Sequence, residues 1–207
     1  MKKQALRLIL NAVIALMVAS AWLYMVFGSE GGTLSDTGVR SLKYFTVLSN
    51  LLEGGCSALF LLSFRFRRLR RAVDFGKYAA AVAVGLTFST VMLILGPGYG
   101  YQHMFLGANL WFHLVVPLLA AAEFLFLNEA PMGAKENAWA LLPVLLYGAV
   151  YAVVNLTGGQ PYPFDVYGFL RRGMAMGLVV FALLTGLSYL IGLALRKGNQ
   201  RLLRSRP

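Results

Sequence analysis

Four polar residues lie at helical spacing near the start of one long apolar segment. Lys43, Thr46, Asn50 and Glu53 are separated by three, four and three positions, within an apolar run from about Ser41 to Phe64. At about 100° per residue, these positions share one face of a helix. Polar groups in hydrocarbon are costly unless they face a protein interior or a wet cavity. The stripe therefore predicts an internal polar site in a membrane protein.

A second polar pair lies on a later apolar segment. Asn109 and His113 are four residues apart and therefore share a helix face. At a rise of about 1.5 Å per residue, Thr46 and His113 are expected at similar depths below the same membrane surface. A hydroxyl and an imidazole at one depth can act as a nucleophile and its general base. Pro117 removes the helix partner of the His113 carbonyl, so the helix can bend beside the imidazole.

Each of these residues also has a structural interpretation. A threonine in a membrane helix usually bonds its own backbone or a neighbouring helix. Glu53 and Glu123 are either proton carriers or structural partners that stay protonated, and Glu123 lies near the inner end, where exposure also explains it. The aromatic loop around Tyr162 either covers the site or forms an interfacial belt. Arg171 either flanks a helix or anchors a carboxylate. The candidate substrate-binding residues are Lys43, Asn50, Asn109, Tyr162 and Arg171.

The elements that must position these residues are membrane-spanning helices. Of the 207 residues, 58% are hydrophobic and 13% are charged, against about 25% charged in soluble domains. Ala19-Ser20-Ala21 resembles a signal-peptide cleavage site, but the apolar run continues to Phe27, so we expect the first helix to be retained. The sequence predicts an all-α polytopic membrane protein with six transmembrane helices in one bundle, as a single domain over residues 1–207. The expected helices cover about residues 7–27, 40–64, 77–96, 107–127, 138–156 and 171–195.

The positive charge predicts topology rather than nucleic-acid binding. The formal net charge is +11, but the basic residues sit at the ends of apolar segments. With six helices, all but four of the 19 Lys and Arg fall on the side of both termini. The positive-inside rule then predicts cytoplasmic termini and a location in a bacterial inner membrane. The four basic residues on the other side are Arg40, Lys43, Arg171 and Arg172.

The sequence argues against several classes of functional site. Cys56 is the one cysteine, so an intrachain disulfide or a cysteine-based zinc site is excluded. A bis-histidine haem needs two intramembrane histidines, and only His113 falls inside an expected helix. GxSxG and HExxH motifs are absent from the sequence. We therefore expect no metal and no cofactor.

The motifs resemble those of the androgen-induced membrane hydrolase family, which includes the androgen-dependent TFPI-regulating protein. The resemblance rests on Lys43-Tyr44-Phe45-Thr46 with Asn50, on Asn109-Leu110-Trp111-Phe112-His113 with Pro117, and on Tyr162-Pro163-Phe164, in that order. It covers nearly the whole chain and implies a multi-pass hydrolase of esters between a fatty acid and a hydroxy fatty acid. Thr46 matches the family's nucleophile and His113 its histidine. The proline after His113 is shifted by about one residue against the animal pattern.

The sequence leaves three functions open. The first is a lipid-ester hydrolase in which Thr46 attacks an acyl carbonyl and His113 carries the proton. The second is a proton-coupled carrier that uses Glu53 and His113 as titrating groups. The third is a non-catalytic membrane scaffold. The expected partners are a lipid substrate and the bilayer, without nucleic acid, and the oligomeric state is not predicted. Hydrolysis that needs Thr46 favours the first function, and gradient-driven uptake that needs Glu53 favours the second.

Overall fold

The described part of the chain is helical and contains six segments that can span a membrane. The computed structural model describes residues 2–27, 38–158 and 165–205, and no strand occurs among them. The six segments are long and apolar enough to cross a bilayer, so the chain is an all-α integral membrane protein, as predicted. They cover Lys2–Phe27, Phe45–Ser63, Arg70–Tyr99, Ala108–Leu127, Ala134–Thr157 and Met174–Arg204.

The first two spans differ from the sequence expectation at their starts. Helix α1 (Lys2–Phe27) begins five residues earlier than expected, so Arg7 lies inside it. Helix α2 (Phe45–Ser63) follows a separate 3-10 helix, η1 (Gly38–Lys43). Tyr44 between them is extended, with φ −89° and ψ 131°. Lys43 is therefore not on the face of α2, and the predicted stripe loses its first member.

The third span is longer than expected at both ends. After the 3-10 turn η2 (Arg67–Leu69), helix α3 (Arg70–Thr90) starts within the basic segment that was expected to be a loop. It continues through a π turn, η3 (Val91–Leu95), into α4 (Gly96–Tyr99). Gly96-Pro97-Gly98 was expected to end the helix but stays helical. The span ends at Gly100, whose φ of 88° favours glycine.

The fourth span contains two π turns. A short helix α5 (Tyr101–Met104) precedes it. The span runs through α6 (Ala108–Leu110), η4 (Trp111–Val115), α7 (Val116–Ala122) and η5 (Glu123–Leu127). In η4 the N–H of Val116 bonds the carbonyl of Trp111, five residues back, immediately before Pro117. The expected irregularity near His113 is therefore a π turn, a feature common at functional sites.

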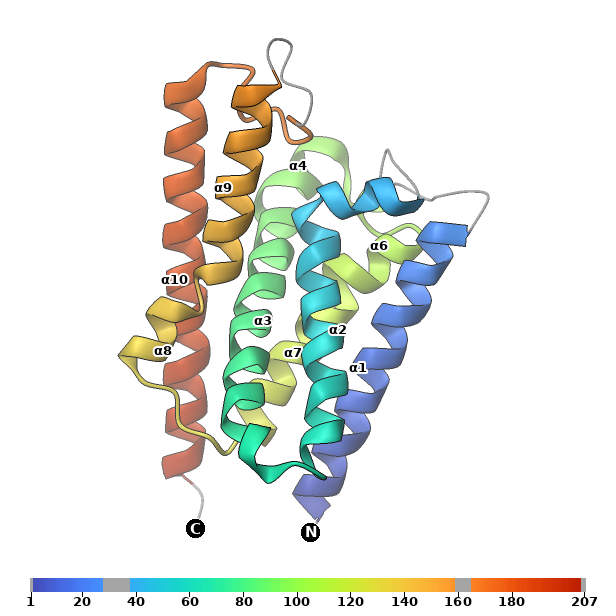
Figure 1. The fold of residues 1–207 in the computed structure, drawn as a ribbon, viewed down its shortest axis with the longest axis vertical. Helices are drawn as coiled ribbons and strands as arrows, with labels where there is room; N and C mark the ends of the chain where they lie inside the picture. The colour runs from blue at the N-terminus through green and yellow to red at the C-terminus, as the bar shows by residue number, and fades with distance from the viewer. Residues whose placement is uncertain (1, 28–37, 159–164, 206–207) are drawn as a thin grey trace.

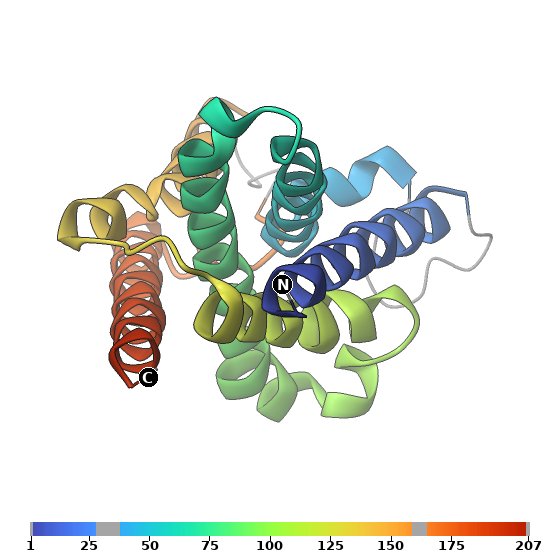
Figure 2. The ribbon, with the colours of Figure 1, turned by 90° about the horizontal axis from the view of Figure 1, so that it is seen from below.

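The last two spans form the outer side of the bundle. Helix α8 (Ala134–Trp139) and helix α9 (Leu142–Thr157) make the fifth span, with a break before Pro143. Helix α10 (Met174–Arg204) continues nine residues past the expected end, so the basic tail is mostly helical. Figure 1 shows α9 and α10 side by side at one edge and α1 at the other, with α3 between them. Both ends of the described chain lie at the same end of the bundle, as six spans require (Figures 1 and 2).

Two apolar clusters hold the spans together. One joins α1, α2 and the fourth span through residues such as Val18, Val47 and Phe112. The other joins α3, the fourth span and α10 around Tyr78 and Phe124. Gly54 lets α1 approach α2 closely, since a Cβ there would lie 2.7 Å from a Val18 methyl carbon. This close packing holds α1 against α2.

Candidate functional site

The polar stripe of α2 faces the interior of the bundle. Thr46, Asn50, Glu53 and Ser57 follow one another at spacings of four, three and four residues, and all are buried. Ser49 lies beside the stripe, and its hydroxyl oxygen is 3.0 Å from the hydroxyl oxygen of Thr87 in α3, so the two hydroxyl groups share a hydrogen bond. The stripe predicted from the sequence is therefore present as an internal surface, with Ser57 extending it by one turn.

Asn50 connects the turn of α2 that carries Thr46 to the π turn that carries His113. Its side-chain nitrogen donates to the Thr46 carbonyl at 2.8 Å and to the Phe112 carbonyl at 3.0 Å. Both amide hydrogens are used, and this fixes the orientation of the amide. Asn50 therefore holds the two backbone segments next to each other, one residue away from His113.

His113 is buried and its ring orientation is set by a backbone carbonyl. Its Nδ1 lies 2.8 Å from the carbonyl oxygen of Met104. A carbonyl can only accept, so Nδ1 carries the hydrogen and the neutral ring keeps its lone pair on Nε2. This is the tautomer that a general base requires, and Met104 is the orienting group that the sequence did not identify.

Two buried amide oxygens lie in the same region without a hydrogen-bond partner. They are Oδ1 of Asn50 and Oδ1 of Asn109, among the residues that the structure describes. Both side chains are at least 99% buried. A buried acceptor without a donor is unfavourable, so this region favours a molecule that offers hydroxyl or N–H groups.

The other predicted binding residues lie away from this region. Lys43 ends η1, and its ammonium lies 5.4 Å from the centre of the Tyr44 ring. Arg171 is exposed and packs beside Gly168. Tyr162, and with it the predicted lid, falls outside the described residues. Asn50 thus joins the backbone at Thr46 to the backbone next to His113, while Lys43 and Arg171 lie elsewhere. Among the described residues, the Thr46 hydroxyl and the His113 ring form no hydrogen bond with each other, so their predicted pairing stays a prediction.

A pocket of about 870 Å³ lies between α2 and α9. Leu48 and Leu52 of α2 and Leu146 and Val150 of α9 are among its apolar lining residues. Arg40 and Lys43 of η1 line it as well. Thr46 and His113 are not among its lining residues. Ser49 lines the pocket and also donates to the Thr46 carbonyl at 3.1 Å, so the pocket wall adjoins the Thr46 turn.

Tyrosines fix the segment after α9 to the start of α2. The hydroxyl oxygen of Tyr167 accepts the N–H of Phe45 at 2.8 Å, and Tyr147 donates to the Lys43 carbonyl at 2.7 Å. Tyr151 donates to the carboxylate of Asp165. Burial raises the pKa of the Tyr167 phenol to about 12. The first turn of α2, which carries Thr46, is therefore held by neutral phenols.

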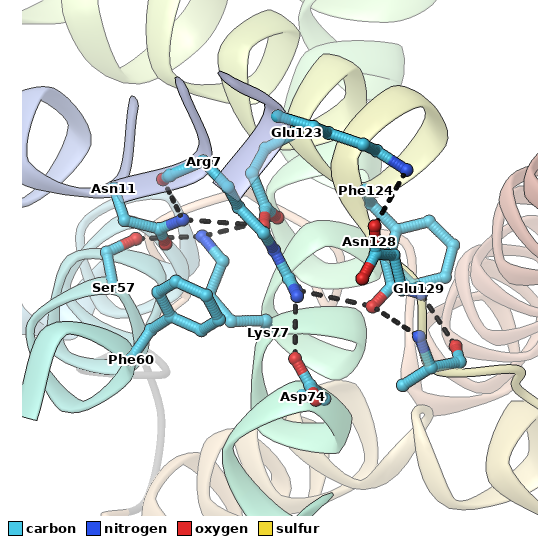
Figure 3. Close-up of polar contacts among 12 residues, drawn as sticks. Arg7, Asn11, Ser57, Phe60, Asp74, Lys77, Glu123, Phe124, Asn128 and Glu129 are labelled. Carbon is cyan, nitrogen blue, oxygen red and sulfur yellow. Dashed lines mark hydrogen bonds and ion pairs between the residues drawn. The ribbon is translucent and has the colours of Figure 1, made fainter. Parts of the chain in front are cut away.

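A buried ionic cluster lies farther along the stripe, toward the termini. Arg7 donates to Glu123 at 2.5 Å and to Asp74 at 2.9 Å (Figure 3). Lys77 bonds Glu53 and lies 3.9 Å from Glu123. Arg7 and Lys77 were expected at the ends of their helices as topology charges, and exposure was one explanation for Glu123, but all three are buried. Helices α1 and α3 begin at Lys2 and Arg70, so Arg7 and Lys77 lie inside their helices and not at the ends.

Comparison with known proteins identifies no relative. No family model, no curated protein and no solved structure matches the chain. The function is therefore argued from the geometry above and from the motif resemblance.

Proposed function

We propose that the chain is a membrane lipid-ester hydrolase with Thr46 as nucleophile and His113 as general base. The observation that supports it most is the hydrogen bond from His113 Nδ1 to the Met104 carbonyl, because it leaves Nε2 as a proton acceptor. Asn50 adds support because it joins the Thr46 turn to the segment of His113. The proposed substrates are esters of a fatty acid, such as those with a hydroxy fatty acid.

The proposed reaction has two stages. The Thr46 hydroxyl attacks the acyl carbonyl while its proton passes to His113 Nε2, and that proton then goes to the departing alkoxide. The acyl group is now an ester of Thr46. His113 next takes a proton from water, the hydroxide attacks the acyl carbon, and the fatty acid leaves as Thr46 regains its proton. Nδ1 keeps its hydrogen on the Met104 carbonyl throughout, so the ring does not need to turn.

The amide residues take different roles in this proposal. Asn50 cannot also donate to an oxyanion, because both its N–H groups are bound to backbone carbonyls. It is a positioning residue. Its free oxygen and that of Asn109 can accept hydrogen bonds from the attacking water or from a substrate hydroxyl. Asn109 is therefore the better candidate for direct substrate contact.

The pocket between α2 and α9 is the proposed place of an acyl chain. It has an apolar lining and a volume within the usual range for small-molecule sites. Arg40 and Lys43 give it a cationic end, which suits the free carboxylate of a fatty acid ester of a hydroxy fatty acid. Ser49 joins the pocket wall to the Thr46 turn, and this contact is what relates the pocket to the nucleophile in the proposal.

The carrier alternative is favoured by one observation, the burial of Glu53 in a cluster of charges. However, Glu53 is bonded to Lys77 and Ser57, whereas His113 is bonded to Met104. The two titrating groups of that alternative therefore have separate partners. Uptake of a lipid anion driven by a pH gradient, lost in Glu53→Gln and kept in Thr46→Ala, would favour the carrier.

The decisive experiment is hydrolysis of a panel of lipid esters by the purified protein. We expect Thr46→Ala and His113→Gln to lower turnover to background, and Thr46→Ser to keep part of it. Matched controls are Thr185→Ala on α10 and His103→Ala, an exposed histidine in α5. Both controls should retain full turnover. Full activity of Thr46→Ala, or folded protein that cleaves no ester in the panel, would reject the proposal.

A further inference from the structure

Five ionisable side chains meet inside the bundle near the end that carries both termini. They come from four spans: Arg7 from α1, Glu53 from α2, Asp74 and Lys77 from α3, and Glu123 from η5. Their side chains are between 0% and 7% exposed. Figure 3 shows Arg7 between the carboxylates of Glu123 and Asp74, with Lys77 on the other side of Glu123.

In both glutamates of the cluster, only one of the two carboxylate oxygens accepts hydrogen bonds. Glu53 Oε1 accepts from Lys77, which also donates to Ser57 at 2.8 Å. Glu123 Oε1 accepts from Arg7 Nε, while Asn11 lies at 3.4 Å from the same oxygen. The second oxygens of Glu53 and Glu123 have no hydrogen-bond partner among the described residues. Two carboxyl groups therefore each keep one buried oxygen that can hold a hydrogen.

The charges of the cluster do not balance when all five groups are ionised. Three carboxylates face two cations, which leaves one excess negative charge in an interior of low dielectric constant. An unpaired buried charge of this kind is strongly unfavourable, and taking up a proton removes it.

The nearby charges outside the cluster do not supply the missing cation. Arg71 has a side chain that is 95% exposed and lies 4.0 Å from Glu136. Lys3 is paired with Glu129, an exposed carboxylate. Arg70 is half-buried, stacks on Phe64 at 5.2 Å and interacts electrostatically with Asp74, but it forms no ion pair with the cluster among the described residues. Water and salt screen the charges of Arg71 and Lys3, and in part that of Arg70. The thiol of Cys56, also close to Glu53 and Lys77, is not a cation in any state.

We propose that this cluster is a proton-binding site that holds one proton, shared between Glu53 and Glu123, at neutral pH. The proton forms one O–H bond to a carboxylate oxygen and comes from water. With it bound, three carboxyl groups and two cations are neutral together. The proposal does not depend on ester hydrolysis, since Thr46 and His113 are not part of the cluster.

A second pocket gives the site contact with one compartment. It has a volume of about 890 Å³ and is lined by Arg68, Arg70, Arg71 and Asp74, among others. Asp74 is the cluster member in that pocket, and its carboxylate is bonded to Arg7, which is bonded to Glu123. The cluster therefore borders the side on which both termini lie, at Asp74.

Infrared spectroscopy of the intact protein in lipid vesicles tests the proposal. A protonated carboxyl group has a C=O stretching band that a carboxylate lacks, and this band shifts in heavy water. At neutral pH we expect a band of one carboxyl group. Glu53→Gln, Glu123→Gln and Asp74→Asn should each abolish it, because each leaves two carboxylates for two cations. The matched control Glu129→Gln, which removes an exposed carboxylate, should leave the band unchanged.

The pH dependence gives an independent measurement on the unmodified protein. As the pH rises, the proton leaves, the excess negative charge appears, and the midpoint of thermal unfolding in detergent should fall. This alkaline loss should be smaller in Glu123→Gln, which has no such proton. Absence of the carboxyl band from the unmodified protein, or its persistence in all three variants, would show that the cluster binds no proton. If a variant fails to fold, the presence or absence of the carboxyl band in the unmodified protein still decides the question.

Discussion

Asn50 donates a hydrogen bond of 3.0 Å to the backbone carbonyl of Phe112, which is 62 residues away in the chain. The same nitrogen donates to Thr46 of its own helix. One neutral side chain thus sets the distance between the second and fourth spans at the level of the candidate site. The carbonyl of Phe112 precedes His113, so a change at Asn50 is transmitted to the imidazole through the backbone.

Replacing Asn50 by leucine should therefore cost both stability and activity. The side chain keeps a similar size, but the buried Phe112 carbonyl loses its donor, which costs about 1–3 kcal/mol. Thermal unfolding in detergent and ester turnover are the two measurements. Asn50→Asp should be at least as harmful, because carboxylate oxygens would face two carbonyl oxygens. An Asn50→Leu protein with unchanged stability would contradict the bridging role.

Arg7→Met should destabilise the protein strongly. It leaves Glu123 and Asp74 without their shared cation, and breaking a buried pair in this way costs about 3–5 kcal/mol. The double variant Arg7→Met with Glu123→Gln should recover part of the loss, since one of the stranded charges is gone. Lys3→Met is the control, because its pair with Glu129 is partly exposed and should contribute about 0–1 kcal/mol. Equal effects of Arg7→Met and Lys3→Met would argue against the cluster.

Tyr167→Phe should loosen the start of α2. The Phe45 N–H loses its acceptor at 2.8 Å, with an expected cost of about 1–3 kcal/mol in unfolding free energy. Turnover should fall as well, because Thr46 is in the same helical turn. Tyr147→Phe is a useful comparison, since it removes a bond to the Lys43 carbonyl just before α2. If Tyr167→Phe and the unmodified protein had similar turnover, the hydrogen bond between Tyr167 and Phe45 would have no role in positioning Thr46.

The same phenol predicts a loss of stability at alkaline pH. Folding raises the pKa of Tyr167 from its ordinary value of 10 to about 12, because burial disfavours the phenolate. The neutral phenol is thus favoured in the folded state, and its contribution is complete below about pH 10 and is lost as the pH rises toward about 12. Ultraviolet titration should show one late-ionising tyrosine fewer in Tyr167→Phe. An unchanged titration curve would assign the late ionisation to other tyrosines.

The termini should both face the cytoplasm. The structure places them at one end, and the charge distribution selects the side. Reporter fusions at Glu129 and after the C-terminus should give a cytoplasmic signal, and a fusion at Tyr99 should give the opposite one. A periplasmic signal at Glu129 and the C-terminus would reverse the orientation, and with it the side of the pocket at Asp74.

The sequence predicted the parts of the molecule that depend on local pattern. Length and hydropathy predicted the six spans, and helical spacing predicted the internal face of Thr46, Asn50 and Glu53. Lys43 was placed wrongly on the face of the second helix, because the extended Tyr44 interrupts the helix and a spacing rule assumes no interruption. Arg7 and Lys77 were missed because their partners come from other helices, and pairing across a fold is not visible in one segment. The tautomer of His113 likewise depends on Met104, which lies in another short helix.

The π turn at Trp111–Val115 gives the fourth span one residue that an ordinary helix of the same rotation would not hold. The parts before and after the turn, with Asn109 on one side and Glu123 on the other, therefore face as they would in an α-helix one residue shorter. Deleting a residue such as Leu114 would let the segment close as an ordinary helix and should leave both of those faces in place. Only the turn that carries His113 would change, so the extra residue sets the direction of the imidazole independently of the rest of the span.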